Sequence, residues 1–211
     1  MFDLVKSIQS RDPARPTFFE VLFAYNGFHA VALHRCANVV WRMGLHALAR
    51  FMANIARIFT GVEIHPEASI GKNLFIDHGT GVVIGQTTII KDNVTIYHGV
   101  TLGGIGASGS VDGKRHPTIE SNAMIGAGAQ VLGNITIGEG AKVGANSVVT
   151  NDVPAHKVAL GIPARIIGSD AHARAYGMPG REEIETLTST IDTLQREVEE
   201  LKKSLPPKKS T

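Results

Sequence analysis

The sequence predicts a mainly β protein: a parallel β-helix over about residues 62–167, preceded by an α-helical cap and followed by a heptad helix. Three patterns carry this prediction. Aliphatic residues recur every six positions in the middle of the chain, apolar residues recur every three or four positions before it, and a heptad seam follows it. Most of the 23 glycines lie between residues 61 and 168, which marks a change of composition at the start of the β-helix.

Residues 1–61 form the predicted helical cap. Its apolar side chains recur at helical spacing, at Phe18, Phe19, Leu22, Phe23, Phe28, Val31, Ala32, Cys36, Val39 and Val40. Gly27 and Gly44 divide this pattern into segments, and residues 45–59 repeat it. We expect these helices to pack their apolar stripes against the rest of the protein.

A six-residue period defines residues 62–167. The aliphatic positions are Ile64, Ile70, Ile76 and Val82, then, after a slip of two residues, Ile84, Ile90, Ile96 and Leu102, and finally Ile119, Ile125, Val131, Ile137, Val143 and Val149. This period does not fit an α-helix of 3.6 residues per turn. It fits short strands that turn corners, with three hexads in each triangular coil. Stacked coils would then bury a ladder of aliphatic side chains.

Residues 103–118 break the period and must leave the coil. This extruded loop is rich in glycine and ends in two basic residues and His116; a long excursion from a regular solenoid is typical of a binding face. Gly104, Gly106 and Gly109 match the G-x-G-x-x-G pattern of dinucleotide-binding proteins, but that motif requires a following helix in a βαβ unit. No helical pattern follows, so the sequence argues against that fold.

The chain after the last hexad divides into three parts. We expect a linker at 168–181, a helix at 182–205 and a flexible tail at 206–211. The helix carries apolar residues alternately three and four positions apart, at Ile184, Leu187, Ile191, Leu194, Val198, Leu201 and Leu205. This seam predicts a coiled coil, which the residue types favour as two-stranded; the alternative is a single amphipathic helix lying on the β-helix.

Composition argues against several classes of protein. The formal net charge is only +2 and there is no basic stripe, so we expect no nucleic-acid partner. No apolar run reaches the roughly 20 residues of a membrane span, and the polar N-terminus differs from a signal peptide. Cys36 is the only cysteine, so no internal disulfide can form. These features predict a cytoplasmic protein.

Two histidines are candidates for chemistry. His78 lies at an expected coil edge between Asp77 and a glycine, where an imidazole can face a cleft and exchange a proton. His116 closes the extruded loop. The histidines of the middle segment, including His65 and His98, lack the spacing of zinc ligands, so we predict no metal site. There is no G-x-S-x-G motif to indicate a serine hydrolase.

Several motifs together resemble the serine O-acetyltransferase family. They are Ile64-His65-Pro66 with Ala68 and Ile70-Gly71, Asp77-His78 with Thr80-Gly81, residues 100–104, Arg115-His116-Pro117, residues 124–129, and residues 161–165. The resemblance reaches back through Asp12-Pro13 and residues 27–30, and covers about residues 10–168. It implies a left-handed β-helix and a homotrimer with active sites between subunits. It also implies acetyl transfer from the co-substrate acetyl-CoA to the hydroxyl of L-serine, the first step of cysteine biosynthesis.

The same resemblance implies roles for individual residues. His78 matches the general base, which the reaction needs because a serine hydroxyl is too weakly acidic to attack a thioester unaided. Glu63 stands where the family often has an aspartate paired with that base. The residues implied at the substrate are Asp12 and Asp77 for its ammonium group, Arg115 for its carboxylate, and the neighbouring His116. Those implied on the CoA side are Gly104, Ala127, Lys142 and Ala145.

Departures from the family pattern bear on partners. The N-terminal region is shorter than in members that join two trimers through it, so we expect no hexamer by that route; the heptad helix leaves a higher assembly open. Members that dock to O-acetylserine sulfhydrylase end in an apolar residue, whereas this chain ends Lys-Lys-Ser-Thr, so we expect no such docking. Feedback inhibition by L-cysteine is implied by the family. Gln86, which follows Gly85, stands where the family usually has a glutamate.

Three other hypotheses stay open at this point. Another hexapeptide acyltransferase would act on a sugar or antibiotic hydroxyl, although a neutral acceptor needs no clamp of Asp12, Asp77 and Arg115. A metal-dependent hydratase like the γ-type carbonic anhydrases requires three histidines that converge on zinc. A non-catalytic scaffold held together by its tail would not bind CoA.

Overall fold

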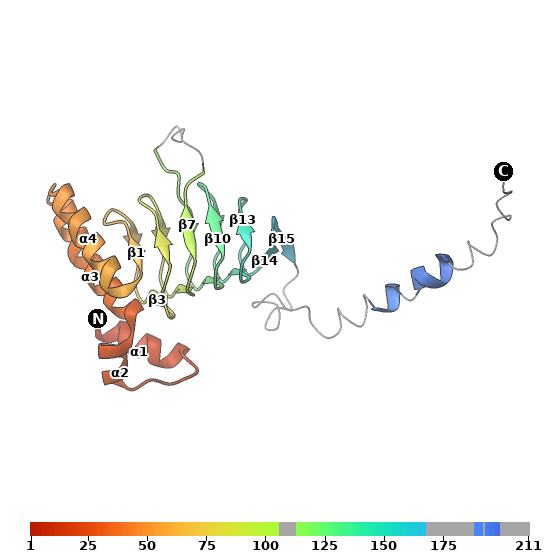
Figure 1. Ribbon diagram of the computed structural model, residues 1–211, viewed down its shortest axis with the longest axis horizontal. Helices are drawn as coiled ribbons and strands as arrows, with labels where there is room; N and C mark the ends of the chain where they lie inside the picture. Colours follow the sequence, from red (N-terminus) through yellow and green to blue (C-terminus); the bar gives the residue numbers. More distant parts are fainter. Residues whose placement is uncertain (106–112, 168–187, 192, 199–211) are drawn as a thin grey trace, which may run out of the picture. The chain divides into compact units, whose positions relative to one another are not determined.

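A computed structural model describes residues 1–105, 113–167, 188–191 and 193–198 (Figure 1). The chain divides into two compact units, Met1–Gly177 and Met178–Thr211. In the second unit, residues 188–191 and 193–198 are helical, and the seam residues Ile191, Leu194 and Val198 are exposed. The expected linker at 168–181, the rest of the expected helix at 182–205 and the tail at 206–211 lie outside the described residues.

The N-terminal cap consists of α1 (Phe2–Arg11), α2 (Phe18–Ala24), α3 (Asn26–Arg42) and α4 (His46–Thr60). Thr17 caps α2, because its hydroxyl accepts from the Glu20 backbone N–H while the Glu20 carboxylate accepts from the Thr17 N–H. Gly61 ends α4 at φ +72°, a conformation that glycine adopts without a steric penalty. The predicted helical cap is therefore confirmed.

Gly27 does not separate two helices, contrary to the expectation from the sequence. The break falls at Tyr25, between α2 and α3, and Gly27 lies inside α3. A β carbon built on Gly27 would lie 2.0 Å from the carbonyl oxygen of Ile76 in β3 (Phe75–Ile76). The glycine therefore lets α3 touch the β-helix rather than ending a helix. Gly44, at φ +82°, does follow the end of α3.

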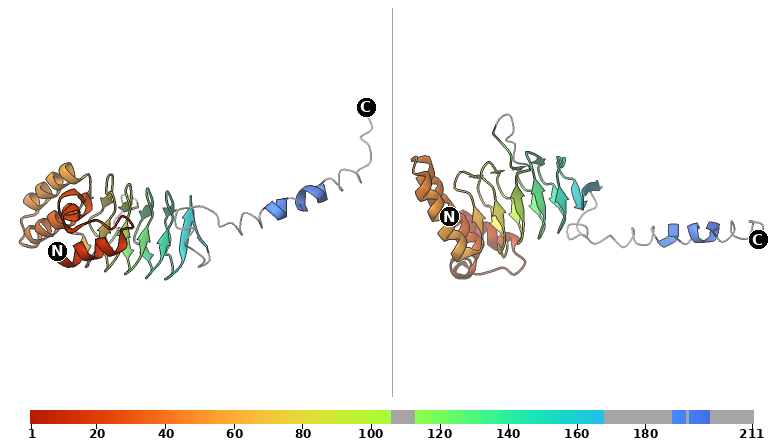
Figure 2. Two further views of the ribbon diagram at one scale, coloured as in Figure 1. Left: turned by 90° about the horizontal axis from the view of Figure 1, so that it is seen from below. Right: turned by 45° about the horizontal axis from the view of Figure 1, so that its top comes forward.

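The described residues 63–167 form short strands in three sheets, with two to four residues in each strand (Figure 2). Sheet A contains β1 (Glu63–Ile64), β4 (Val83–Ile84), β7 (Thr101–Gly103), β10 (Gln130–Leu132) and β13 (Val148–Val149). Sheet B contains β2 (Ser69–Ile70), β5 (Ile89–Ile90), β8 (Thr118–Ile119) and β11 (Thr136–Ile137). Sheet C contains β3, β6 (Thr95–Ile96), β9 (Met124–Ile125), β12 (Lys142–Val143), β14 (Val158–Gly161) and β15 (Ala164–Ile167). The pairing is parallel except that β15 runs antiparallel to β14 and ends the ladder.

The six-residue period places one aliphatic side chain of each hexad in the interior. In sheet A, the register aligns Ile64, Ile84, Leu102, Val131 and Val149, and similar ladders run through sheets B and C. All the predicted period positions are 0–5% exposed except Ile70, which is partly buried. Each buried aliphatic side chain stabilises the fold by roughly 1.5–3 kcal/mol. The predicted β-helix is thus confirmed.

The two-residue slip in the period falls at one corner of the β-helix. Six residues, 77–82, join β3 to β4, whereas four residues, 97–100 or 126–129, make the corresponding corner in the next two coils. The long corner contains three left-handed residues, His78, Gly79 and Gly81, where each regular corner contains one. The two extra residues therefore explain why this corner has more left-handed residues than the corresponding corners, with His78 among them.

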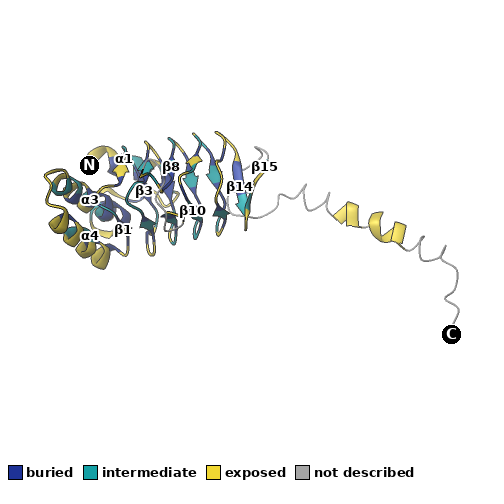
Figure 3. Cartoon of the chain, turned by 90° about the horizontal axis from the view of Figure 1, so that it is seen from above, coloured by how far each residue is buried: buried dark blue, intermediate teal, exposed yellow. Residues whose placement is uncertain are grey.

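The helical cap leaves much of its apolar surface exposed (Figure 3). Phe18, Phe19 and Phe23 are 37, 68 and 74% exposed, so the expected packing of these side chains is wrong for the single chain. The buried faces of α3 and α4 use small residues such as Ala37 and Ala49, which let neighbouring helices approach closely. Even so, none of the described helices is long and apolar enough to cross a membrane.

Candidate active site

Most of the predicted site residues lie on two edges of the β-helix. We call the corners from sheet C to sheet A, residues 77–82, 97–100, 126–129 and 144–147, the C–A edge. We call the corners from sheet A to sheet B, which include residues 85–88 and residues 113–117 before β8, the A–B edge. Within one chain, sheet A separates the two edges.

His78 lies open on the C–A edge. Its side chain is 77% exposed, and its Nε2 is 4.0 Å from Oδ1 of Asp77. The ring of His98, one coil further along, makes an edge-to-face contact with it at 6.0 Å between centroids. An imidazole held this loosely can reach a ligand and exchange a proton with it.

Small residues continue the C–A edge beyond these histidines. The Gly99 N–H donates to the Thr80 carbonyl at 2.9 Å and the Gly128 N–H to the His98 carbonyl at 2.8 Å. The Asn146 N–H donates to the Ala127 carbonyl at 2.8 Å. The predicted CoA-side residues Ala127 and Ala145 therefore follow His98 along one line, and Lys142 lies close by in β12 of sheet C.

A cavity of about 370 Å³ adjoins His78 where the cap meets the β-helix. Asp12, Tyr25 and Asp77 line it together with His78, so the structure brings the two predicted carboxylates together. Burial raises the pKa of Asp77; the adjacent His78 opposes this rise and the charge of Asp12 adds to it. Two carboxylates that face one cavity favour a cation between them.

The A–B edge holds the second group of predicted residues in a different way. His116 is only 6% exposed. Its Nδ1 lies 3.2 Å from the Thr87 backbone nitrogen and 2.9 Å from the Thr87 hydroxyl. The same hydroxyl accepts from the backbone N–H groups of Arg115, at 3.0 Å, and His116, at 3.2 Å. A β carbon on Gly104 would lie 3.3 Å from the Arg115 carbonyl, so Gly104 belongs to this edge too.

These contacts define the tautomer of His116. The Thr87 oxygen already accepts two N–H groups, so its own proton is left to donate to Nδ1. Nδ1 is then an acceptor and the ring proton lies on Nε2. Burial lowers the pKa of His116, and the charges of Arg115 and Lys114 lower it further. His116 is therefore a neutral hydrogen-bond donor through Nε2.

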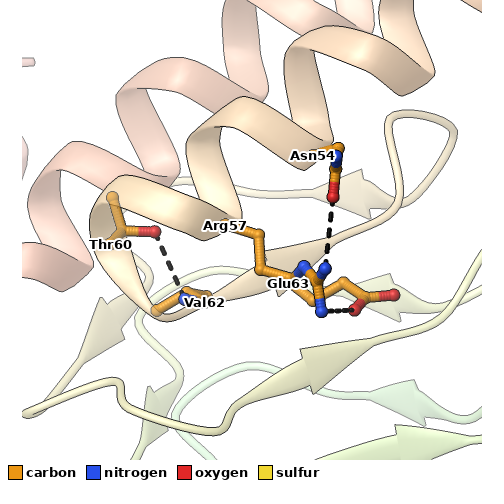
Figure 4. A network of polar contacts seen from close by, with 5 residues as sticks. All are labelled: Asn54, Arg57, Thr60, Val62 and Glu63. Carbon is orange, nitrogen blue, oxygen red and sulfur yellow. Dashed lines mark hydrogen bonds and ion pairs between the residues drawn. The ribbon is translucent and has the colours of Figure 1, made fainter.

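Glu63 pairs with the end of α4 rather than with the expected base (Figure 4). Its Oε2 lies 3.7 Å from Nη1 of Arg57, whose Nη2 donates to Asn54 at 3.2 Å. Both side chains of the ion pair are about half exposed, at 52% and 51%, and such pairs contribute only about 0–1 kcal/mol. Within 4.0 Å, the described ion pairs of His78 do not include Glu63. The orienting role of Glu63 stays a prediction.

The histidines of the β-helix do not converge on a metal site. His78 and His98 lie on the C–A edge, whereas His65 and His116 lie on the A–B edge. Throughout the part of the chain that the structure describes, no group of three or more His, Cys, Asp or Glu side chains could hold a metal ion.

Three residues at the site escaped the sequence reasoning as contributors. Tyr25 contacts Asp12, Thr87 contacts His116, and His98 contacts His78. These contacts join residues 13, 29 and 20 positions apart in the chain. No spacing pattern signals them, because the corners and the cap bring them together only in the folded chain.

The fold and the site define a class of protein, the hexapeptide-repeat transferases. Residues 116–151 match the family described as "Bacterial transferase hexapeptide (six repeats)". A serine acetyltransferase of Bacillus pumilus is 45% identical over 201 residues, which cover 95% of this chain and 91% of the relative. One from Mycobacterium tuberculosis is 55% identical over 164 residues, 78% of this chain and 70% of the relative. The chain belongs to the serine acetyltransferase family.

Solved structures of this family share the fold. Serine acetyltransferase of Brucella abortus in complex with coenzyme A matches with a TM-score of 0.75 and 42% identity, over 78% of this chain and 65% of that one. Soybean serine acetyltransferase complexed with serine gives 0.74 and 47%, over 77% and 66%. A serine acetyltransferase in complex with cysteine gives 0.75 and 42%, over 78% and 67%. The chain thus spans about two thirds of these solved chains, and its β-helix is left-handed as theirs are.

Proposed function

We propose that this chain transfers the acetyl group of acetyl-CoA to the hydroxyl of L-serine, which gives O-acetyl-L-serine and CoA as the first step of cysteine biosynthesis. The observation that carries the proposal is the cavity in which Asp12, Asp77 and His78 meet. Two carboxylates beside an open imidazole suit an acceptor with an ammonium group and a nearby hydroxyl. A neutral sugar would bring no cationic group to these carboxylates.

In the proposed mechanism, His78 is the general base. Its imidazole takes the proton from the serine hydroxyl while the serine oxygen attacks the thioester carbonyl. The tetrahedral intermediate collapses, the carbon–sulfur bond breaks, and CoA leaves as a thiolate that takes up a proton. The exposure of His78 supports this role, because a base must reach its substrate and then release its proton.

A second chain would complete the binding site. Asp12 and Asp77 would hold the substrate ammonium group, and Arg115, with the Nε2–H of His116, would hold its carboxylate. Sheet A separates Arg115 from His78 within one chain, so the two ends of so small a substrate need edges from neighbouring subunits. We therefore propose a homotrimer in which the C–A edge of one subunit faces the A–B edge of the next.

The co-substrate and an inhibitor fit the same arrangement. The small residues Ala127 and Ala145 would let the pantetheine arm lie along the C–A edge, facing Gly104 of the next subunit. Lys142 would attract the CoA phosphates. The complexes of relatives with coenzyme A, serine and cysteine support the choice of these three molecules as ligands. Cysteine has a thiol in place of the serine hydroxyl, so we propose that it competes for the same clamp.

Mixed trimers test the function and the shared site together. We would co-express His78→Ala and Arg115→Ala chains with different affinity tags, select assemblies that carry both tags, and measure serine-dependent release of CoA from acetyl-CoA. Each mixed trimer has one site with an intact histidine edge and an intact arginine edge, so activity should return to about a third of wild type.

Three results would count against the proposal. A wild-type chain that acetylates other hydroxyl compounds but not L-serine would overturn the substrate. Mixed trimers as inactive as their parents would place both edges in one site of one chain, and tags that never co-purify would exclude the trimer.

A cytoplasmic location, which the lone Cys36 supports, and the lack of docking to O-acetylserine sulfhydrylase remain predictions.

A further inference from the structure

The Asp12 carboxylate is oriented by two donors. Its Oδ1 accepts the Ala14 backbone N–H at 2.8 Å, and its Oδ2 accepts the Tyr25 hydroxyl at 2.6 Å. A carboxylate oxygen can accept two hydrogen bonds. Each oxygen of Asp12 therefore keeps one acceptor position for a ligand in the cavity that Asp12 and Tyr25 both line.

The backbone at Asp12 is held separately, by Arg11. The Arg11 guanidinium donates to the carbonyl oxygens of Asn73 and Val94 and to the Thr95 hydroxyl. It also lies over the Phe75 ring, 5.4 Å from the centroid. These contacts fix the end of α1 on the first two coils of the β-helix. Tyr25 therefore affects the direction of the Asp12 side chain and not the position of its backbone.

The charges in the cavity explain why a neutral donor is useful there. Asp12 and Asp77 are two carboxylates that face the same space, and the charge of Asp12 adds to the burial that raises the pKa of Asp77. Burial raises the pKa of Tyr25 too, and its hydrogen bond to Asp12 adds to the rise. The phenol therefore stays protonated and always donates. A neutral donor orients a carboxylate without supplying a positive charge that would compete with a cationic ligand.

We propose that Tyr25 is a positioning residue, which holds the Asp12 carboxylate turned toward the ammonium group of the amino-acid substrate. The proposal rests on the proposed function, because it takes Asp12 as a ligand of that group. Through Tyr25, the helical cap selects for an amino-acid acceptor, while the β-helix supplies the base. An acceptor without an ammonium group, such as 3-hydroxypropionate, gains nothing from Tyr25.

The test is Tyr25→Phe, which removes only the hydroxyl. Because hydrogen bonds to charged groups are the stronger kind, kcat/KM for L-serine should fall about tenfold. The KM for acetyl-CoA and the thermal unfolding temperature should stay unchanged. The loss should be specific to L-serine, so the rate of acetylation of 3-hydroxypropionate, which has no ammonium group, should stay unchanged. Phe23→Leu, at an exposed position of α2, is the matched control and should change none of these.

A double-mutant cycle separates this inference from the proposed function. Asp12→Asn should lower kcat/KM for L-serine strongly, and adding Tyr25→Phe to it should cost little more, because Tyr25 acts through Asp12. If Asp12→Asn keeps near-normal kcat/KM, the ammonium role of Asp12 fails and the proposed function is weakened. If Asp12→Asn is severe but Tyr25→Phe alone has no effect on L-serine, or slows acetylation of 3-hydroxypropionate equally, only the role of Tyr25 is overturned.

Discussion

The two edges of the β-helix hold their histidines in opposite ways. On the C–A edge, His78 sits in a corner with two extra residues, and its side chain is 77% exposed. On the A–B edge, His116 is 6% exposed, and both the backbone N–H and the hydroxyl of Thr87 lie within hydrogen-bond distance of its Nδ1. One imidazole is exposed and has few fixed partners, and the other is buried and held by a neighbouring residue.

This difference matches the two tasks that we propose. A general base has to change its protonation state in every turnover, so it needs access to solvent and few fixed partners. A residue that orients a substrate works best in one tautomer and one rotamer. In our proposal, the exposed histidine therefore transfers the proton, and the buried histidine helps to orient the substrate.

Loss of the exposed histidine should have the largest effect. We expect His78→Ala to lower kcat by at least ~10²-fold, the low end for loss of a general base, in steady-state assays with saturating acetyl-CoA and L-serine. His156→Ala is the matched control, because His156 is also exposed and also has a positive φ, but lies away from both edges. A His78→Ala enzyme with near-normal kcat would remove His78 from this role.

Releasing the buried histidine should have an intermediate effect. Thr87→Val keeps the shape of the side chain but leaves the N–H groups of Arg115 and His116 without their acceptor. We expect kcat/KM for L-serine to fall about tenfold, the usual scale for a buried polar group without a partner, while Thr87→Ser stays close to wild type. Equal activity of the Val and Ser variants would show that His116 is not held through the hydroxyl.

A third histidine extends the comparison to stability, where we expect the smallest effect. His34 is 5% exposed in α3, and burial lowers its pKa from 6.5 to about 4. Below pH 6.5 the unfolded chain therefore binds more protons than the folded chain, so the stability from His34 is present above that pH and is lost as the pH falls toward 4. Urea unfolding should show that wild type loses about 1 kcal/mol more than His34→Gln between pH 6.5 and 5.5. His156→Gln should track wild type; equal losses in wild type and His34→Gln would contradict the expectation.

Much of the fold follows from the sequence. The period of six predicts one aliphatic side chain on each strand that faces the interior. The register of the sheets accordingly places Ile64, Ile84 and Leu102 in one ladder. The slip after Val82 indicates an irregular corner, and the structure places His78 in it. The helical cap was harder to predict in detail. Gly27 resembles a helix break, but its lack of a side chain serves contact between α3 and β3.

By itself the sequence determined the β-helix, its edge histidine and the family, because these depend on local spacing and on motifs that stand close together in the chain. Only the tertiary structure decided which residues share an edge. Asp12 and Tyr25 of the cap line one cavity with Asp77. His116 is buried against Thr87, and Glu63 forms an ion pair with Arg57. The physical reason is that burial and hydrogen bonding depend on distance in space, which the positions of these residues along the chain do not give.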